Sequence, residues 1–343
     1  MTDKVIALDA MGGDYGPKVV VPAALGVLKQ FPDLSLILVG DRDKISSMLT
    51  KHHASETDHL KIHHSTEVVE MDEKPSHALR YKKDSSMRVA INLVHQGQAQ
   101  ACVSAGNTGA LMATARFVLK TLPGIDRPAI LGRLPTRRGT VRMVDLGANI
   151  DSTVENLFQF AVMGAVVAES VDGIARPKIG LLNIGEEEIK GNEQVKQTGQ
   201  LLSQTSFINY IGYIEGSDIN TGGIVDVIVC DGFIGNVAIK TSEGVSKLIS
   251  HIIRRAYNKN WMTKIALFLS RNILAEVREE INPANYNGAS LVGLRGIVIK
   301  SHGSAQVDGF TTAIREAISE VENQVPERIS GRLSQLLQVT ESQ

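Results

Sequence analysis

Short apolar runs alternate along this chain with segments of helical periodicity, and this alternation constrains the fold most. The runs lie at residues 5–8, 36–39, 101–103, 143–146, 179–182 and 227–229. Such runs are typical of parallel strands that are buried on both faces and joined by crossover helices. Aromatic residues make up only 4% of the chain, and glycines gather at strand ends, which argues against an antiparallel sandwich or barrel. We therefore expect an α/β protein, a three-layer α/β/α sandwich of Rossmann-like type.

The 343 residues could form one large domain or two. No internal repeat, low-complexity tract or proline-rich linker marks a boundary. We predict a single catalytic α/β/α domain over residues 1–343, with a protruding basic amphipathic helical hairpin at 244–285 within it. The segment 52–83, rich in His, Glu and Lys, is expected to be a surface excursion.

The charges nearly balance, with 36 Lys and Arg against 37 Asp and Glu. A net charge of −1 provides no global positive field for nucleic acid, so we expect no nucleic-acid partner. Cys102 and Cys230 lie within apolar runs and are predicted to be core thiols. The first residues lack the order of a signal peptide, and no run approaches the ~20 apolar residues that span a bilayer. We expect a reduced, cytoplasmic protein.

Glycine-rich loops follow three of the predicted strands. One contains Gly12, Gly13 and Asp14, the second contains Gly106, Asn107 and Thr108, and the third runs from 145 to 149. Glycines let bare backbone N–H groups approach an anion at a helix N-terminus. Any one of these loops could be a plain turn. Three of them together favour a phosphate or a phosphorylated ligand.

Other nucleotide and metal motifs are missing from the sequence. No Gly-x-Gly-x-x-Gly follows a strand, and no Gly-Lys-Ser/Thr occurs, which disfavours an ordinary Rossmann dehydrogenase and a nucleoside triphosphatase. The adjacent pairs at 52–53 and 63–64 are expected to be solvated histidines. We therefore predict neither a metal site nor a cofactor.

Four polar residues near strand ends could carry chemistry. Lys190 follows three glutamates and precedes Gly191, so its cation could meet a phosphate or an oxyanion, or could belong to a solvated helix start. Asp231 and Asn236 enclose two glycines at a strand-to-helix junction, either as site residues or as a capped turn. His302 follows an apolar strand and could carry a proton or be structural.

These segments together resemble a known family. The pieces are LDAMGGDYGP (8–17), SAGNTG (104–109), DLGAN (145–149), LNIGEEEIKGNE (182–193), DGFIGNV (231–237) and GSA (303–305). They are similar to the bacterial acyl-acyl-carrier-protein:phosphate acyltransferase family of phospholipid synthesis, PlsX, in order and from residue 1 to about 335. The pattern departs from that family at Asn287 and Ser290, where Gly and Pro are expected.

The resemblance implies transfer of a fatty acyl group from acyl-acyl carrier protein to inorganic phosphate. The product is an acyl phosphate, which is used for glycerol-3-phosphate acylation. A fold similar to the isocitrate and isopropylmalate dehydrogenases and to phosphotransacetylases is implied, as a homodimer without a cofactor. The implied partners also include a peripheral membrane surface at the inner face of the membrane and the downstream glycerol-3-phosphate acyltransferase. The resemblance implies that Lys190 and Asn236 are catalytic residues. Asp231 and His302 are second-rank catalytic candidates.

Two basic segments are candidate partner surfaces. Residues 244–275 contain no acid and carry more apolar side chains than one core face needs; those of interest are Arg254, Arg255, Lys259, Trp261, Lys264 and Phe268. An acidic carrier protein, a second subunit or an anionic bilayer would each suit this segment. Arg137 and Arg138 lie in a second acid-free run at 127–144, which could receive the carrier protein or be a solvated loop.

Three other functions compete with this interpretation. A phosphotransacylase that uses acyl-coenzyme A would have similar loops. A decarboxylating NAD-dependent dehydrogenase would need a metal cluster of carboxylates, for which Asp145, Asp231 and Glu186 could be mistaken. A non-catalytic scaffold that recruits lipid-synthesis enzymes would bind without turnover.

Overall fold

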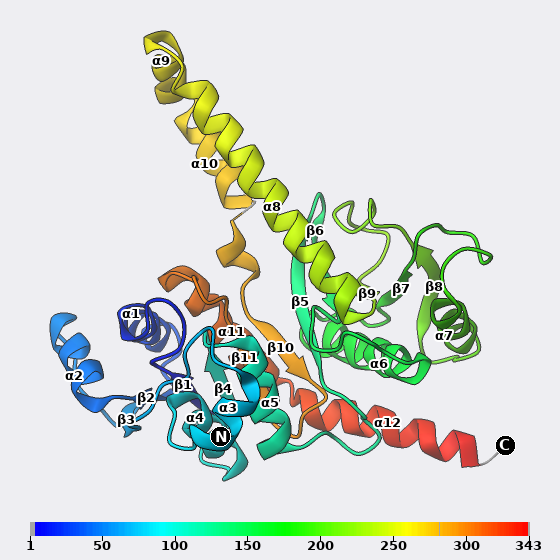
Figure 1. Ribbon diagram of the computed structural model, residues 1–343, viewed down its shortest axis with the longest axis horizontal. Helices are drawn as coiled ribbons and strands as arrows, with labels where there is room; N and C mark the ends of the chain where they lie inside the picture. Colours follow the sequence, from blue (N-terminus) through cyan, green and yellow to red (C-terminus); the bar gives the residue numbers. More distant parts are fainter. Residues whose placement is uncertain (1–3, 281, 342–343) are drawn as a thin grey trace.

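The protein is described by a computed structural model that covers residues 4–280 and 282–341. Within these residues, eleven strands form one sheet in the order β3-β2-β1-β4-β11-β10-β5-β6-β9-β7-β8 (Figure 1). The strands are β1 (Lys4–Asp9), β2 (Leu34–Gly40), β3 (Leu60–His64), β4 (Ala101–Ser104), β5 (Ala129–Thr136), β6 (Gly139–Val144), β7 (Lys178–Leu182), β8 (Asn209–Ile214), β9 (Val227–Val229), β10 (Ala289–Val292) and β11 (Ile297–Lys300). The α/β class is therefore confirmed.

The sheet consists of two parallel groups that run in opposite directions. Strands β3, β2, β1, β4 and β11 are parallel to one another, and so are β6, β9, β7 and β8. Between the groups, β10 pairs antiparallel with β11 and β5, and β5 pairs antiparallel with β6. The strands predicted from apolar runs, which correspond to β1, β2, β4, β6, β7 and β9, are each parallel to a neighbour as expected. The antiparallel strands β5 and β10 were not among the predicted runs, and they make the sheet mixed.

The β5–β6 turn explains where the direction reverses. Thr136 pairs with Gly139, so only Arg137 and Arg138 connect the two strands. Gly139 has a φ of 102°, which a residue with a side chain rarely adopts. The run at 127–144 is therefore a strand hairpin and not a loop. Similarly, residues Leu60–His64 of the expected surface excursion form edge strand β3.

Helices cover both faces of the first group of strands. One face packs against α1 (Pro17–Leu28), α2 (Arg42–Lys51) and α11 (Val307–Glu322). The other packs against α3 (Pro75–Tyr81), α4 (Ser86–His95) and α5 (Thr108–Leu119). Cys102 lies in this second core cluster, and Cys230 is buried in the other half of the sheet, so the prediction of two core thiols is confirmed.

The second group of strands is covered less evenly. On one face lie α6 (Val154–Ser170), α7 (Glu193–Ser203) and α12 (Val325–Glu341). On the other, the first turns of α8 (Gly232–Tyr257) pack against the strands through Ala238 and Ile239. A 3₁₀ turn, η1 (Pro283–Tyr286), leads back into β10.

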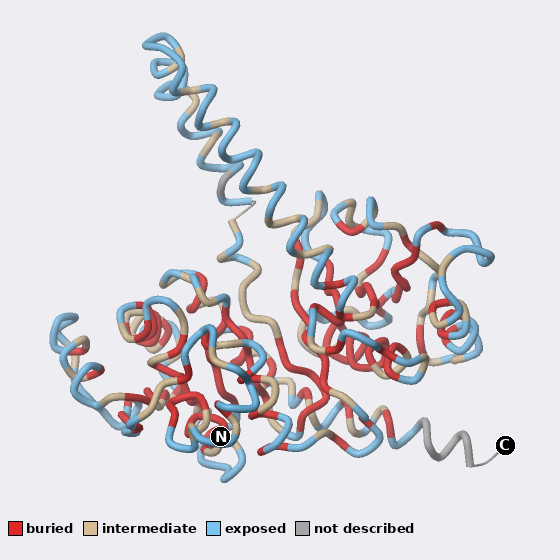
Figure 2. Tube along the Cα trace, viewed as in Figure 1, coloured by how far each residue is buried: buried red, intermediate tan, exposed pale blue. Residues whose placement is uncertain are grey.

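Most of α8 extends beyond this core, together with α9 (Trp261–Leu269) and α10 (Arg271–Glu280) (Figure 1). The only buried residues of α8 are Gly232 and Gly235, and α9 has none. Figure 2 shows this projection as almost entirely exposed. It coincides with the predicted hairpin at 244–285, of which Ile281 lies outside the described residues. None of the helices described here is long and apolar enough to cross a bilayer.

A buried ionic cluster joins the β5–β6 hairpin to α11. Arg142 is 2% exposed and donates hydrogen bonds to Asp172 at 2.6 and 2.8 Å and to Glu316 at 2.8 Å. Burial alone would lower the pKa of Arg142, but the hydrogen bond to Asp172 and the charge of Glu316 raise it. Removing one member would leave an uncompensated buried charge, which costs about 3–5 kcal/mol.

Glu320 lies beside this cluster with one carboxyl oxygen unpartnered. Its Oε2 accepts a hydrogen bond from Ser290 at 3.0 Å, whereas Oε1 is buried without a partner among the described residues. Burial, and then the charge of Glu316, raises the pKa of Glu320 to about 8. The side chain is therefore protonated in the folded protein at neutral pH.

This raised pKa predicts a pH-dependent stability. The folded carboxyl holds its proton up to about pH 8, whereas the unfolded one loses it near 4.5, so its contribution is complete below 4.5 and is lost as pH rises through 8. We expect Glu320→Gln to flatten the fall in the free energy of unfolding across this window, measured by urea titration. The exposed control Glu327→Gln should keep the wild-type slope. An unchanged slope in Glu320→Gln would contradict the assignment.

Candidate active site

The carboxyl ends of β1, β4 and β11 meet around one buried carboxylate. Asp9 is 1% exposed and accepts hydrogen bonds from the hydroxyls of Ser86 and Ser104, each at 2.6 Å. It also accepts the backbone N–H groups of Met11 at 3.3 Å and Gly12 at 3.1 Å. Burial raises the pKa of Asp9, although these hydrogen bonds oppose the rise. Asp9 thus holds the first glycine loop on the end of the sheet.

The loops after these strands are in close contact. A Cβ on Gly12 would lie 2.5 Å from the Asp9 carboxylate and 2.8 Å from the backbone nitrogen of Gly106, so only glycine fits there. The N–H of Asp14 donates to the carbonyl of Gly303 at 2.9 Å. The loops at Gly12–Asp14 and at Gly106, both predicted to bind phosphate, therefore lie side by side.

Asn107 and Thr108 begin α5 beside these loops. Asn107 caps the helix by accepting the N–H of Ala110 at 3.0 Å. Its amide nitrogen donates to the carbonyls of Met71 at 2.8 Å and Glu73 at 3.0 Å. Both ends of this amide are thus engaged within the protein. Thr108 is exposed at the first position of the helix, so its hydroxyl is accessible to a ligand.

Lys300 ends β11, and His302 lies on the loop that follows it. The ring nitrogen Nδ1 of exposed His302 lies 2.9 Å from the Ser304 hydroxyl, and partial burial lowers its pKa. Lys300 was missed as a site residue. It ends β11, is 8% exposed, and places its ammonium at the same loops. The sequence signal that could have identified Lys300 is its position directly at the end of an apolar strand.

A second buried carboxylate organises the end of β6. Asp145 is fully buried and accepts five hydrogen bonds, from the backbone N–H groups of Ile130, Gly147, Ala148 and Asn149 and from the Asn149 side chain. Burial raises its pKa, and these hydrogen bonds oppose the rise. Asp9 and Asp145 share one sequence signal, an aspartate between an apolar strand and a glycine loop.

The first turn of α8 is seated on this second loop. A Cβ on Gly235 would overlap the carbonyl oxygen of Asp145, so glycine allows the close approach. Asp231 caps α8 by accepting the N–H of Phe233 at 2.8 Å, and its other oxygen accepts the N–H of Ser152 at 2.8 Å. Asn236 is exposed on the next turn, beside Gly147. Asp231 thus holds the turn that presents Asn236.

Lys190 lies on the loop after β7 and is separate from these groups. Its Nζ forms an ion pair with Glu187 at 2.8 Å, and the hydrogen bond that Lys190 donates to this carboxylate raises the pKa of Lys190. The Asn183 amide donates to the Lys190 carbonyl at 3.2 Å. No hydrogen bond or ion pair in the described chain joins Lys190 to Asn236 or to the glycine loops.

The two loop groups approach each other through α5 and α8. Because the strand groups run in opposite directions, their carboxyl ends do not share one edge of a flat sheet. Met112 of α5 packs on the same core cluster as Ile239 of α8. The charge of Lys240 on α8 also lowers the pKa of Lys300 and His302.

The basic run at 127–144 divides into paired and unpaired arginines. Arg127 pairs with Asp151, and Arg133 and Arg142 pair with Asp172 and Glu316. Arg137 and Arg138 are exposed at the β5–β6 turn and form no ion pair with the described residues. They are therefore the cations of this run that are available to a partner.

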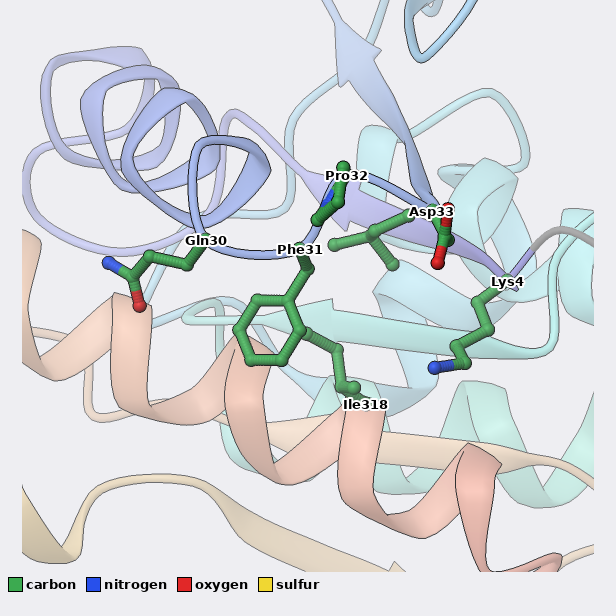
Figure 3. A pocket seen from close by; sticks show the side chains of 7 residues that line it. Lys4, Gln30, Phe31, Pro32, Asp33 and Ile318 are labelled. Carbon is green, nitrogen blue, oxygen red and sulfur yellow. The ribbon is translucent and has the colours of Figure 1, made fainter.

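Two hollows lie away from these loops. One of about 90 Å³ is lined by Lys4, Gln30, Phe31 and Ile318 at the amino ends of β1 and β2 (Figure 3). The other, of about 470 Å³, lies at the end of α5 around Phe117. Neither is lined by a predicted site residue. In the described part of the chain, no group of three or more His, Cys, Asp or Glu side chains is placed to hold a metal ion.

Known proteins resemble this chain over its whole length. A phosphate acyltransferase of Alkalilimnicola ehrlichii is 57% identical over 343 residues, covering all of both chains. One from Legionella pneumophila is 55% identical over 337 residues, 98% of each chain. Identity of 55–57% over nearly the whole length of both chains shows that these proteins and this chain belong to one family.

Solved structures show the same fold at low identity. A phosphotransacetylase from Streptococcus pyogenes superposes with a TM-score of 0.62 at 20% identity, over 93% of this chain and 94% of that one. A 4-hydroxythreonine-4-phosphate dehydrogenase from Klebsiella pneumoniae gives 0.55 at 14% identity, over 93% and 98%. Residues 4–328 match the family described as "Fatty acid synthesis protein". The chain therefore belongs to this family, which is the family of the phosphate acyltransferases.

Proposed function

We propose that this protein transfers a fatty acyl group from acyl-acyl carrier protein to inorganic phosphate, forming acyl phosphate for phospholipid synthesis. The observation that carries the proposal is the contact between the Gly12 and Gly106 loops at the ends of β1 and β4. Bare N–H groups in such loops, next to the N-termini of α1 and α5, favour an anion. The names of the relatives at 55–57% identity support phosphate as the acceptor.

The chemistry needs positioning more than a covalent nucleophile. A phosphate oxygen attacks the thioester carbonyl carbon, a tetrahedral oxyanion forms, and its collapse expels the carrier thiolate, which takes up a proton. The phosphate cradle in this proposal is lined by Gly12, Gly13, Asp14, Gly106, Asn107 and Thr108. Because the N–H groups of Gly12, Asp14 and Gly106 and the Asn107 amide are engaged within the protein, the donors to phosphate are the N–H groups of Gly13, Asn107 and Thr108 and the Thr108 hydroxyl. Lys190 and Asn236 stabilise the oxyanion or align the phosphate, and Lys190 must leave Glu187 to do so.

His302 and Asp231 take supporting roles. His302 lies on the loop beside the cradle, and its lowered pKa keeps the ring neutral and able to accept a proton near pH 7. Asp231 holds the first turn of α8.

The whole chain acts as one catalytic α/β/α domain, akin to the isocitrate and isopropylmalate dehydrogenases. The helices that cover both faces of the first group of strands support this organisation.

Lys190→Ala and Asn236→Ala test the catalytic roles. Each should lower turnover about 100-fold or more, because one preorganised donor to a developing oxyanion is lost. The assay measures phosphate-dependent release of free carrier protein, with acyl phosphate trapped by hydroxylamine. Lys196→Ala, on α7, is the matched control and should keep wild-type turnover. Near-normal turnover in both variants would remove these roles.

The same assay separates the competing enzyme class. Acyl-coenzyme A and acyl-carrier-protein thioesters are offered side by side with phosphate. We expect the carrier thioester to be preferred. A preference for acyl-coenzyme A would instead assign the phosphotransacetylase type of reaction, which the fold similarity also accommodates.

Arg137 and Arg138 form the proposed docking surface for the acidic carrier protein. The turn that bears them is held by loop 220–223, because the N–H of Arg137 donates to the Asn220 carbonyl at 3.0 Å and the Asn220 amide donates to Pro135 at 2.7 Å. Both cations are exposed and unpaired among the described side chains, so they can attract a carboxylate-rich partner.

Charge reversal at both arginines should weaken carrier binding. We expect Arg137→Glu with Arg138→Glu to raise the KM for the acyl carrier thioester by about tenfold and to reduce its salt dependence, with kcat unchanged. The control Lys51→Glu with Lys61→Glu makes the same charge change at the end of α2 and on β3. A KM and salt dependence equal to those of the control would exclude this patch.

We propose that the α8–α10 projection mediates homodimerisation and peripheral attachment to the inner face of the membrane, where the downstream glycerol-3-phosphate acyltransferase would receive the product. Trp261 is 70% exposed and Phe268 65% exposed, with Arg254, Arg255, Lys259 and Lys264 exposed nearby. Arg271 stacks 4.9 Å from the Phe268 ring centre. Apolar and cationic side chains in this mixture favour an anionic lipid surface.

The single tryptophan reports directly on membrane attachment. Its emission should shift to shorter wavelength with anionic vesicles and much less with neutral ones, and Trp261→Ser with Phe268→Ser should abolish vesicle sedimentation. Phe117→Ser, at another exposed aromatic, is the control. Unchanged emission in a protein of dimeric mass would assign the surface to the second subunit alone.

A further inference from the structure

We propose that Lys300 supplies the fixed positive charge that binds the phosphate acceptor in the cradle, a role that rests on the proposed function. It is the last residue of β11, which lies directly beside β4, so its side chain starts between the two strand ends that carry the glycine loops. Lys300 was not among the residues predicted from the sequence.

The ammonium of Lys300 is buried without a carboxylate partner. The side chain is nearly inaccessible, and Nζ donates to the carbonyl oxygen of Ala105 at 3.5 Å and to that of Ser301. No carboxylate of the described residues lies within ion-pair distance of it. A buried ammonium balanced only by neutral carbonyls is costly, and an anion beside it would lower that cost.

Asp9 contributes charge but forms no ion pair with this cation among the described residues. Its oxygens already accept from Ser86, Ser104 and two backbone N–H groups. Asp9 therefore acts on Lys300 at longer range, and its negative charge favours the ammonium form. The hydrogen bonds of Asp9 fix the loop in place, which leaves Lys300 available to a ligand.

Burial and three charged groups, on β1, the loop after it and α8, bear on this ammonium. Asp9 on β1 and Asp14 on the following loop favour its charged form, whereas burial and Lys240 on α8 disfavour it. The balance lowers the pKa of Lys300 to about 8, so the side chain is mostly charged at neutral pH. Bound phosphate would favour the charged form further.

The backbone places this cation at the anion site. Ala105, which accepts one hydrogen bond from Lys300, immediately precedes Gly106 of the phosphate loop. Ser301 precedes the loop whose Gly303 carbonyl receives the N–H of Asp14.

The N–H groups of Gly12, Gly106 and Asp14 already donate to Asp9, Ser104 and Gly303 and hold the loops in place. Gly13 lies against Ala105 and Gly303, and its N–H group has no acceptor among the described residues. This N–H group, the N-terminus of α5 and the ammonium of Lys300 together form a binding arrangement for a phosphate dianion.

Lys300→Met and Lys300→Arg test this role with inorganic phosphate as the probe. We expect Lys300→Met to raise the KM for phosphate about 10- to 100-fold, as for a lost charge-assisted hydrogen bond, with the KM for the thioester unchanged. Stabilisation by inorganic phosphate in thermal unfolding should be lost as well. Lys61→Met, on edge strand β3, is the control and should behave as the wild type.

The arginine variant tests the protonation of Lys300. Phosphate binding to the wild type should weaken as pH rises through about 8, because the ammonium is lost, whereas arginine keeps its charge. The ratio of the phosphate KM values, wild type over Lys300→Arg, should therefore rise with pH, and phosphate ionisation cancels in this ratio. This comparison decides the matter if Lys300→Met does not fold.

Two results would overturn the role of Lys300. One is an unchanged phosphate KM and thermal shift in a folded Lys300→Met. The other is a KM ratio that does not vary with pH. A fall in kcat alone would assign Lys300 to the oxyanion instead. If the wild type failed to turn over acyl thioesters but lost phosphate stabilisation on Lys300→Met, the proposed function would fail and the phosphate site would remain.

Discussion

Two buried carboxylates hold the ends of the strands from which the candidate site is made. Asp9 and Asp145 each lie where an apolar strand passes into a glycine loop, and each accepts at least four hydrogen bonds. Burying a carboxylate is unfavourable unless such bonds surround it, so the loops can take only a narrow range of conformations. The N–H groups that remain are thereby preorganised for an anion.

The long helix α8 connects the candidate site with the exposed projection. It begins at Asp231, whose two oxygens hold its first turn, and continues to Tyr257, where the Tyr257 hydroxyl lies 3.1 Å from Ser270. Its 26 residues span about 39 Å. An acyl phosphate is apolar at one end and anionic at the other. In the function proposed above, this helix joins the anion site to the exposed apolar side chains of the projection.

Direction and pairing of the central strands could not be predicted from apolar runs alone. A hairpin is formed by Ala129–Thr136 and Gly139–Val144, and its arginine side chains lie in different environments. Arg142 faces inward to Asp172 and Glu316, and Arg137 faces solvent. Sequence distance hides this difference, because Asp172 and Glu316 lie 30 and 174 residues away from Arg142.

The sequence by itself determined the α/β class, the buried cysteines and the glycine loops, because burial and backbone freedom are local properties of residue type. The family resemblance carried by its motifs was also sufficient to assign the family. Only the tertiary structure decided that the strand groups oppose each other, that Lys190 pairs with Glu187 and that Lys300 is a buried cation. These features depend on neighbours that are distant in the chain, and a lysine acquires an unusual charge environment only when the fold removes water from it.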